Sequence, residues 1–208
     1  MPSSRPCERA IRLKPDLAIA AIVPLNAAPI SQADRDALIK DLERSRTIFL
    51  DAIADVKTEA QWNYKPAPDR WSVAECAAHI IAAEQYFRDG IASTLKTPPL
   101  PPEKQSTAGD AVISKMVRDR TAKFPAPAEL EPKGKVVPKT QAIKEFEATR
   151  AKTLEYVRTT KDPLREHGNP TPAGQVTTAY QMVLMLSGHT ERHTAQLLEV
   201  KASAGYPK

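Results

Sequence analysis

Apolar residues recur at intervals of three and four along separate stretches of the chain, and this spacing predicts amphipathic helices. The first helix is expected over residues 31–57, with Ser31 as its N-cap. The second is expected over residues 72–95, where Ser72 and Glu75 have the spacing of a capping box. In that motif the serine side chain bonds forward and the glutamate side chain bonds back, so the start of this helix is well defined.

Two further helices are expected over residues 140–161, with Thr140 as cap, and over residues 176–203. In the last helix, positions separated by steps of four and three form one stripe: Met182, Leu186, His189, His193, Gln196 and Val200. Four such helices bury their apolar faces best against one another. The sequence therefore predicts an all-α protein whose core is a four-helix bundle.

Proline-rich segments separate the expected helices. Residues 58–70 and 162–175 are expected to be loops, because proline excludes regular helix. Residues 97–139 hold two proline-rich stretches around a short apolar pattern, which predicts an insertion with a short helix at 110–122 between helices two and three. The bundle domain is expected to span residues 31–205. Residues 1–30 are expected to form a variable, partly ordered N-terminal extension.

Composition narrows the classes of function. The chain has 208 residues, 41% hydrophobic and 26% charged, which is typical of a globular protein with a core. The net charge is +5, but lysines and arginines are spread among acids instead of forming one run, so nucleic-acid binding is not expected. No apolar run is long enough to predict a membrane span. Two cysteines, Cys7 and Cys76, favour a reducing, cytoplasmic location, and the prolines in residues 15–24 argue against a secretory signal.

The histidines suggest a specific chemistry. His189 and His193 share one face of their helix because they are four residues apart. His79 lies beside the apolar stripe of the second helix, so the three rings can converge between helices. Three imidazoles can hold zinc, nickel, iron or copper and leave a fourth position for water or substrate. The alternative is that they are hydrogen-bonded core residues; His167, in a glycine- and proline-rich loop, is expected to face solvent.

Three other side chains are candidates to orient the histidines. Glu75 lies one turn before His79, and Gln196 lies three residues after His193 on the same face. Either side chain can hold a ring by its free N–H group. For Glu75 the capping role is the favoured alternative. Glu84 lies five residues beyond His79 and hence well round the helix, which makes it the weakest of the three candidates.

A resemblance to a known family rests on two motifs: Trp71-Ser72-Val73-Ala74-Glu75 followed by His79 and Glu84, and His189-x-x-x-His193-x-x-Gln196. In these motifs and in the order of its elements, residues 31–203 resemble the DinB/YfiT-like superfamily of metal-dependent enzymes. The resemblance implies a bundle with up-down-down-up connectivity and one divalent metal ion, zinc, nickel or iron, held by His79, His189 and His193. It also implies a homodimer and similarity to transferases and isomerases that use a low-molecular-weight thiol.

The resulting expectation is a divalent-metal-dependent enzyme acting on a small-molecule substrate, as a thiol-dependent S-transferase or a related hydrolase or isomerase. The alternative is a non-catalytic stress-response module that binds a metal or a small ligand. Glu84 or His167 within bonding distance of the histidines would favour that alternative. The N-terminal residues and the insertion at 97–139 depart from the family pattern, so a relative's substrate does not carry over.

Overall fold

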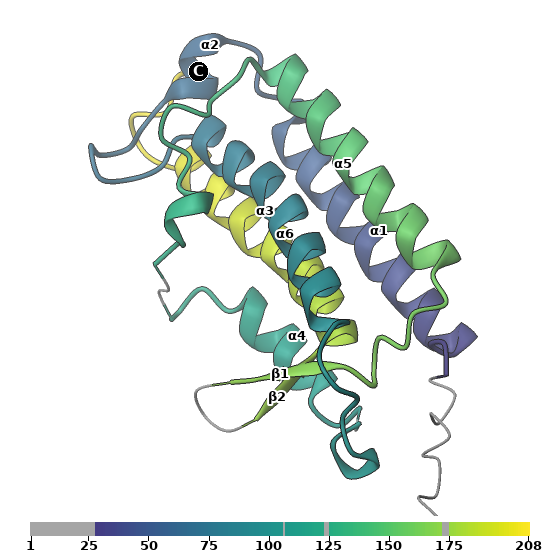
Figure 1. Ribbon diagram of the computed structural model, residues 1–208. Helices are drawn as coiled ribbons and strands as arrows, with labels where there is room; N and C mark the ends of the chain where they lie inside the picture. The colour runs from purple at the N-terminus through teal and green to yellow at the C-terminus, as the bar shows by residue number, and fades with distance from the viewer. Residues whose placement is uncertain (1–27, 106, 123–124, 172–174) are drawn as a thin grey trace, which may run out of the picture.

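Four long helices lie side by side in the computed structural model, which describes residues 28–105, 107–122, 125–171 and 175–208 (Figure 1). The long helices are α1 (Gln32–Ala54), α3 (Val73–Thr94), α5 (Lys139–Thr159) and α6 (Ala179–Lys201). The shorter elements are α2 (Glu59–Asn63), η1 (Pro102–Lys104), α4 (Asp110–Arg118), η2 (Ala128–Leu130), β1 (Gly168–Pro170) and β2 (Val176–Thr178). The expected N-terminal extension lies outside the described residues, apart from residues 28–30.

The connectivity follows from contacts between helix ends. Lys139 at the start of α5 donates to the carbonyl of Ala54 at the end of α1, so these helices are antiparallel. Lys201 at the end of α6 donates to the carbonyl of Ala52, so α6 runs parallel to α1. Thr94 at the end of α3 contacts Met182 near the start of α6, so α3 runs opposite to α6. The predicted up-down-down-up four-helix bundle is confirmed.

Side-chain caps set several of the helix starts. Ser31 accepts from the backbone of the first turn of α1, and Ser72 and Glu75 form the predicted capping box at the start of α3. The prediction that Thr140 caps the third helix is wrong. The cap position is Pro138, whose extended backbone places Lys139 at the first helical residue and Thr140 inside the first turn.

The segments between the long helices are more ordered than predicted. Residues 58–70 contain α2, because Thr58 and Gln61 form a capping box that the prolines farther along do not disturb. The segment 162–175, which was expected to be a loop, contains the strand β1, and β1 pairs antiparallel with β2. Residues 176–178, which were expected to start the last helix, therefore form a strand.

The short helix α4 also differs from its prediction. It ends at Arg118 because the next residue, Asp119, adopts an extended backbone. Two residues of its apolar side, Val112 and Met116, are 65% and 50% exposed. The reason is that α4 packs mainly on the edge of α6 and not inside the bundle.

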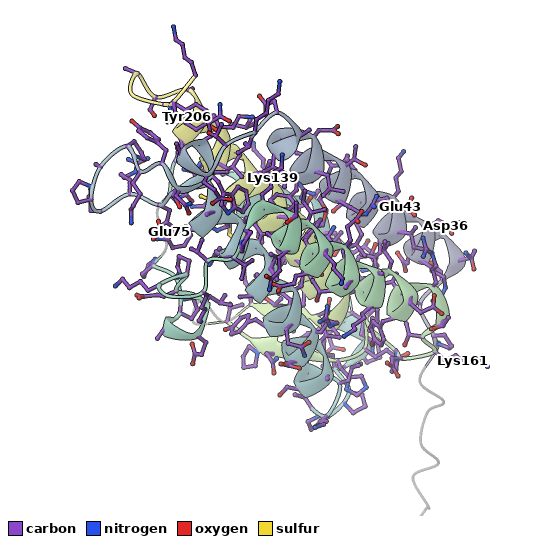
Figure 2. The ribbon with its side chains drawn as sticks, turned by 90° about the horizontal axis from the view of Figure 1, so that it is seen from above. Asp36, Glu43, Glu75, Lys139, Lys161 and Tyr206 are labelled. Carbon is purple, nitrogen blue, oxygen red and sulfur yellow. The ribbon has the colours of Figure 1, made fainter. Side chains whose placement is uncertain are left out.

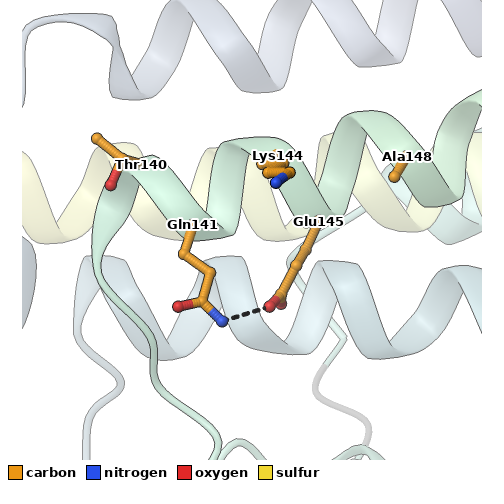
Figure 3. Close-up of a pocket in the computed structure, with 5 residues that line it drawn as sticks. All are labelled: Thr140, Gln141, Lys144, Glu145 and Ala148. Carbon is orange, nitrogen blue, oxygen red and sulfur yellow. Dashed lines mark hydrogen bonds between the residues drawn. The ribbon is translucent and has the colours of Figure 1, made fainter.

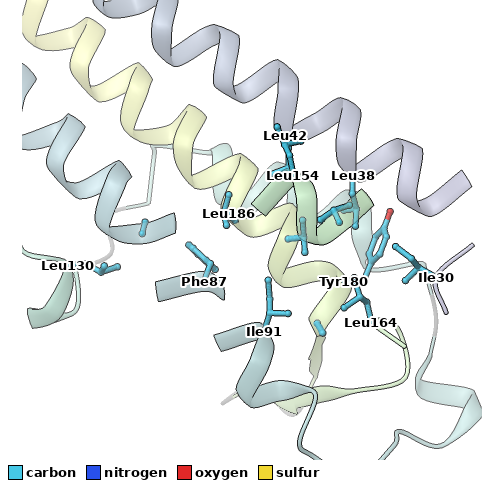
Figure 4. Packing of buried hydrophobic residues seen from close by; sticks show 14 residues of the cluster. Ile30, Leu38, Leu42, Phe87, Ile91, Leu130, Leu154, Leu164, Tyr180 and Leu186 are labelled. Carbon is cyan, nitrogen blue, oxygen red and sulfur yellow. The ribbon is translucent and has the colours of Figure 1, made fainter. Parts of the chain in front are cut away.

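The apolar core fills the space between the four long helices. At one end it includes Leu42 of α1, Phe87 of α3, Leu154 of α5 and Leu186 of α6 (Figure 4). At the other end Phe49 and Phe146 meet edge to face, with ring centroids 4.5 Å apart. Asp36 and Glu43 extend outward from α1 (Figure 2), whereas the charged side chains of Glu84 and Arg150 are buried between the helices. None of the described helices is both long and apolar enough to span a bilayer.

Candidate metal centre

The capping box of α3 and the antiparallel packing of α3 against α6 bring the three histidines together. His79 of α3 is 1% exposed, and its ring centroid lies 4.2 Å from that of His193 and 4.8 Å from that of His189. One nitrogen from each ring lies within 4.8 Å of the other two. The histidines of α6 therefore lie where its inner face meets a pocket.

Hydrogen bonds on the outer side of two rings determine which nitrogens face inward as acceptors. The Nδ1 atom of His79 lies 2.8 Å from the carbonyl oxygen of Leu130, and that of His193 lies 3.0 Å from Oε1 of Gln196. Because these oxygens only accept, each Nδ1 carries the proton and each neutral ring has a lone pair on Nε2. The Nε2 atom of His79 lies 3.1 Å from Nε2 of His189, so the lone-pair side of one ring faces the next.

His189 is less completely bonded than its neighbours. Its Nδ1 atom is buried and has no hydrogen-bond partner among the described residues. Buried polar atoms are rarely left in this state in native proteins. A cation at the centre would be held by nitrogens of all three rings, so this donor set fits a divalent ion of the kind that imidazole prefers.

The electrostatic surroundings keep the rings in the form that binds metal. Burial lowers the pKa of His189 to about 3, with a smaller contribution from the His79 ring. Burial and the two neighbouring rings lower the pKa of His193 to about 2. Burial also lowers the pKa of His79, although its bond to Leu130 acts in the opposite direction. All three imidazoles are therefore neutral at physiological pH, and neutral imidazole is the ligand form.

The residues predicted to orient the histidines make different contacts. Gln196 bonds His193 as described, and its Oε1 atom also accepts from Arg120 at 3.4 Å, which fixes the direction of the amide. Glu75 instead completes the capping box, at 2.8 Å from the backbone nitrogen of Ser72, and pairs with Lys65. Its predicted role beside His79 is therefore wrong, and its alternative role as a cap is confirmed.

Glu84 is the third candidate, and its predicted role beside the histidines is also wrong. Its carboxylate pairs with Arg150 at 2.5 Å, because the turn from His79 to Glu84 directs it toward α5. The residue that sequence reasoning missed is Leu130 of the insertion. Its contribution is a backbone carbonyl, which no side-chain pattern can reveal.

A pocket of about 800 Å³ opens onto the histidines between α3, α4, α6 and the insertion. Trp71 forms part of its wall, with its ring centroid 4.7 Å from that of His79 and 5.7 Å from that of His193. Phe87 lies on the other side, 5.6 Å from His189. His167 is absent from this lining: its Nδ1 atom lies 2.7 Å from the carbonyl of Thr97, so the ring tethers a loop instead of facing solvent as expected.

A second hollow, of about 580 Å³, lies on the outer face of α5 (Figure 3). All the residues that line it come from this one helix, and Gln141 and Glu145 within it are hydrogen-bonded to each other at 2.7 Å. It lacks the converging groups of a binding site. The histidine-lined pocket is therefore the candidate functional site.

Comparison with known proteins agrees with this geometry. A family model described as the DinB superfamily matches residues 41–197. The chain belongs to the DinB superfamily. A protein of similar sequence, the uncharacterized protein YuaE of Bacillus subtilis (strain 168), is 23% identical over 144 residues, which cover 69% of this chain and 85% of YuaE.

A solved structure shows the same fold. YfiT from Bacillus subtilis, described as a probable metal-dependent hydrolase with an unusual four-helix bundle topology, superimposes with a TM-score of 0.53 at 16% identity. The match covers 86% of this DinB-superfamily chain and 91% of YfiT. At this level of identity the likeness establishes the architecture, while the chemistry must be argued from the residues of the site itself.

Proposed function

We propose that this DinB-superfamily protein is a divalent-metal-dependent enzyme whose ion is held by His79, His189 and His193. The observation that carries the proposal is the convergence of three neutral imidazoles within 4.8 Å at the wall of an open pocket. Three nitrogen ligands leave coordination positions for a reactant, which is the arrangement of catalytic rather than structural zinc sites. YfiT, which shares the fold, is itself described as a probable metal-dependent hydrolase.

The alternative of a non-catalytic metal module is less well supported. A structural site needs a fourth protein ligand, and the two residues named for that role are engaged elsewhere. Glu84 is paired with Arg150, and His167 is bonded to Thr97. Within the described residues, the histidines form a three-membered donor set that no carboxylate or thiolate joins.

The lining of the pocket favours a thiol over water as the nucleophile. A divalent ion bound here would lower the pKa of a ligated water or thiol. An ordinary thiol, with a pKa of about 8.5, needs far less help than water at about 15.7. Among the described residues that line the pocket, Asp69 is the one carboxylate, and it is exposed, so the described lining offers no buried carboxylate base to activate water. We infer thiol-dependent S-transfer as the reaction and hydrolysis as the second candidate.

In such a transfer the thiol loses its proton to solvent or buffer. A carbon–sulfur bond forms at the electrophilic carbon while the bond from that carbon to its leaving group breaks, and the leaving group takes the electron pair. The chain's own contribution is to bind and orient the reactants. Trp71 packs against His79 and Phe87 packs against His189, so these aromatic rings exclude water from the parts of the site that they cover.

Metal content gives the first test. Protein purified without a histidine tag should carry a stoichiometric amount of zinc, nickel or iron by elemental analysis. The His189→Ala variant should lose it, and His167→Ala, which alters a histidine outside the pocket, should retain it. Absence of metal from the unaltered protein even after incubation with each ion, or its retention by His189→Ala, contradicts the proposal.

Turnover gives the second test. Metal-loaded protein is incubated with a low-molecular-weight thiol and chlorodinitrobenzene, and separately with a nitrophenyl ester. Metal-dependent formation of the thioether supports S-transfer. Metal-dependent cleavage of the ester without thioether formation would replace S-transfer by hydrolysis and leave the metal site unchanged.

A further inference from the structure

Met182 is the last residue that lines the histidine pocket at one of its ends. Along α6 the lining includes Met182, Met185 and His189, which are three and four residues apart and therefore share one face of the helix. Within the described part of the lining, no residue of α6 precedes Met182 and no residue of α3 follows Phe87. The pocket therefore extends along α6 for about 10 Å, or about two helical turns, from the histidines to Met182.

The part of the pocket between the histidines and Met182 has an apolar lining. It includes Met182 and Met185 of α6, Tyr86 and Phe87 of α3, and Met116 of α4. Methionine side chains are unbranched and flexible, so they adapt to apolar groups of different shapes. Tyr86 and Met116 are 44% and 50% exposed, and an apolar group bound beside them would cover surface that water otherwise contacts. This part of the pocket therefore favours an alkyl or aryl group.

Contacts with α3 hold the side chain of Met182 at the end of the pocket. Its terminal methyl group occupies the space beside Gly90, where a β-carbon would lie 2.5 Å from Cε of Met182. Its Sδ atom lies 3.2 Å from the hydroxyl oxygen of Thr94, which has no exposed surface. That hydroxyl donates to the carbonyl of Gly90 at 2.8 Å and accepts from Asn169 at 2.6 Å. A buried, hydrogen-bonded polar group therefore lies behind Met182.

The α4 wall of the pocket is also held in place. α4 lies close against α6 because residue 188 is Gly188, where a β-carbon would lie 3.0 Å from Cγ1 of Val117 and 3.1 Å from Nη1 of Arg118. Arg118 also pairs with Asp41 of α1 and with Glu191 of α6, at 2.9 Å each. These contacts tie α4 to the bundle, so the room for a bound group depends mainly on the flexible methionines.

We propose that Met182 sets the length of an apolar arm on the substrate, which is an alkyl- or aryl-substituted reactant with its reactive atom at the histidines. The arm lies along Met185 with Phe87 opposite, and its far end contacts Met182. A longer arm would have to displace Met182 toward the hydroxyl of Thr94 or turn outward into solvent, and neither adds apolar contact. This inference rests on the proposed metal-dependent function and specifies its substrate class.

A series of straight-chain thiols, from butanethiol to decanethiol, tests the length limit on metal-loaded protein. Binding is followed by tryptophan fluorescence, to which Trp71 beside the histidines contributes. The affinity of the unaltered protein should rise about threefold to fourfold with each methylene group until the arm reaches Met182, and should then stay constant. Affinity that does not depend on chain length, or that rises at the same rate through decanethiol, overturns the proposal.

Two variants should move the length limit in opposite directions. Gly90→Ala places a methyl group where Cε of Met182 lies, so the methionine side chain should shift into the pocket and the limit should fall to a shorter chain. Met182→Ala removes the end of the pocket, so affinity should rise over additional methylene groups. Alanine is a better helix former than glycine, so α3 should stay folded in Gly90→Ala, which circular dichroism checks. If both variants keep the limit of the unaltered protein, the proposal is wrong.

The double variant Gly90→Ala/Met182→Ala is the internal control. Without the methionine side chain to displace, the added methyl group should not reduce the limit below that of the unaltered protein. A shorter limit in the double variant would show that residue 90 acts without Met182, which overturns the proposal. Ser93→Ala and Leu198→Ala alter exposed residues of the same two helices outside the described lining and should leave the series unchanged. Equal shifts in these controls and in the pocket variants also overturn the proposal.

Failure of the metal site is distinguishable from failure of this inference. Metal content is measured before each titration, and metal-free protein is titrated in parallel with straight-chain alcohols, which need no metal to enter an apolar pocket. If the protein holds no metal, the proposed function fails, but the alcohols should still show a length limit that shifts in the two variants. If metal is present and neither series shows a limit that Met182→Ala extends, the role of Met182 alone is refuted.

Discussion

Two groups of polar side chains are buried in the same bundle, and they differ in how fully their hydrogen-bonding groups are paired. The first centres on Arg150 of α5, which has no exposed surface. Its five N–H groups make five hydrogen bonds, which reach Glu84 on α3, Leu42 and Ser45 on α1, and Thr190 on α6. One guanidinium therefore connects all four long helices.

The second group is the set of three histidines. Two of its rings are held from outside by Leu130 and Gln196, while the Nδ1 atom of His189 is left without a partner among the described residues. The nitrogens that face one another are acceptors in two of the rings. The comparison separates two roles of buried polar side chains. A network in which every donor and acceptor is hydrogen-bonded fixes the packing of the helices, whereas a group with unpaired nitrogens can take up a ligand.

The largest expected effect comes from breaking the satisfied network. Arg150→Met leaves the buried carboxylate of Glu84 without its main partner, and we expect the free energy of unfolding to fall by about 3–5 kcal/mol. Urea denaturation of the metal-free protein measures this loss. The double variant Glu84→Leu/Arg150→Met should be less destabilised than Arg150→Met alone, because no buried charge remains.

The contrast with the histidines supplies the control. His189→Ala should cost the metal-free protein much less stability than Arg150→Met, since the removed ring has an unpaired buried nitrogen. If His189→Ala is the more destabilising change in metal-free protein, the histidines are structural core residues and the distinction between the two groups fails.

The next effect is stabilisation by metal. An ion that binds only the folded protein raises the free energy of unfolding by about 2.7 kcal/mol at a hundredfold excess over its Kd. Thermal unfolding with increasing zinc or nickel should show this rise, and a chelator should reverse it without unfolding the chain. His193→Ala should abolish the stabilisation by metal. Arg150→Met should lower the stability of the metal-free protein but keep the stabilisation by metal. Loss of the stabilisation by metal in both variants would indicate that the histidines and the Arg150 network act as one unit.

A smaller effect is expected from the residue that orients His193. Removing the amide with Gln196→Ala should reduce metal affinity by about 10–100-fold, the usual cost of losing an outer hydrogen bond to a ligand. Gln141→Ala, on the outer face of α5, is the matched control and should leave affinity unchanged. A competition titration against a chelating dye measures both, and equal affinities in the two variants would remove Gln196 from the site.

The sequence predicted the features of the fold that depend on local spacing. The capping box of Ser72 and Glu75 and the four long helices follow from residues within one or two turns of each other. The partnership of Glu84 with Arg150 joins positions 66 residues apart on different helices, so no local pattern indicates it. A signal for Arg150 was nevertheless present, because it lies four residues after Phe146 and therefore on the same helix face, and both residues are buried.

For the site, the sequence indicated the three histidines but not the way in which they are held. Gln196 was found because it is on the same helix face as His193. The carbonyl of Leu130 was not, because every residue has one and its placement depends on how the insertion folds back on α3. The apolar pattern of residues 110–122 predicted a short helix but not what covers its apolar side, because periodicity defines a face without saying what packs on it.

The smallest expected effect concerns a partly buried counterpart of the fully buried ion pair. Arg165 binds Asp34 at 2.6 Å, and this hydrogen bond lowers the pKa of Asp34 below its ordinary value of 3.8. The unfolded chain therefore takes up this proton first, so the pair's contribution is fully present well above pH 3.8 and is lost as the pH falls through the lowered pKa. Because both groups are partly solvated, we expect the pair to contribute about 1 kcal/mol or less to stability.

Urea titrations between pH 7 and pH 3 should show that the free energy of unfolding falls less steeply with acid in Asp34→Asn than in the unaltered protein. An unchanged dependence of the free energy of unfolding on pH would mean that solvation removes the pair's contribution to stability altogether. Burial would then account for the whole difference in stabilisation between the pairs of Asp34 and Glu84.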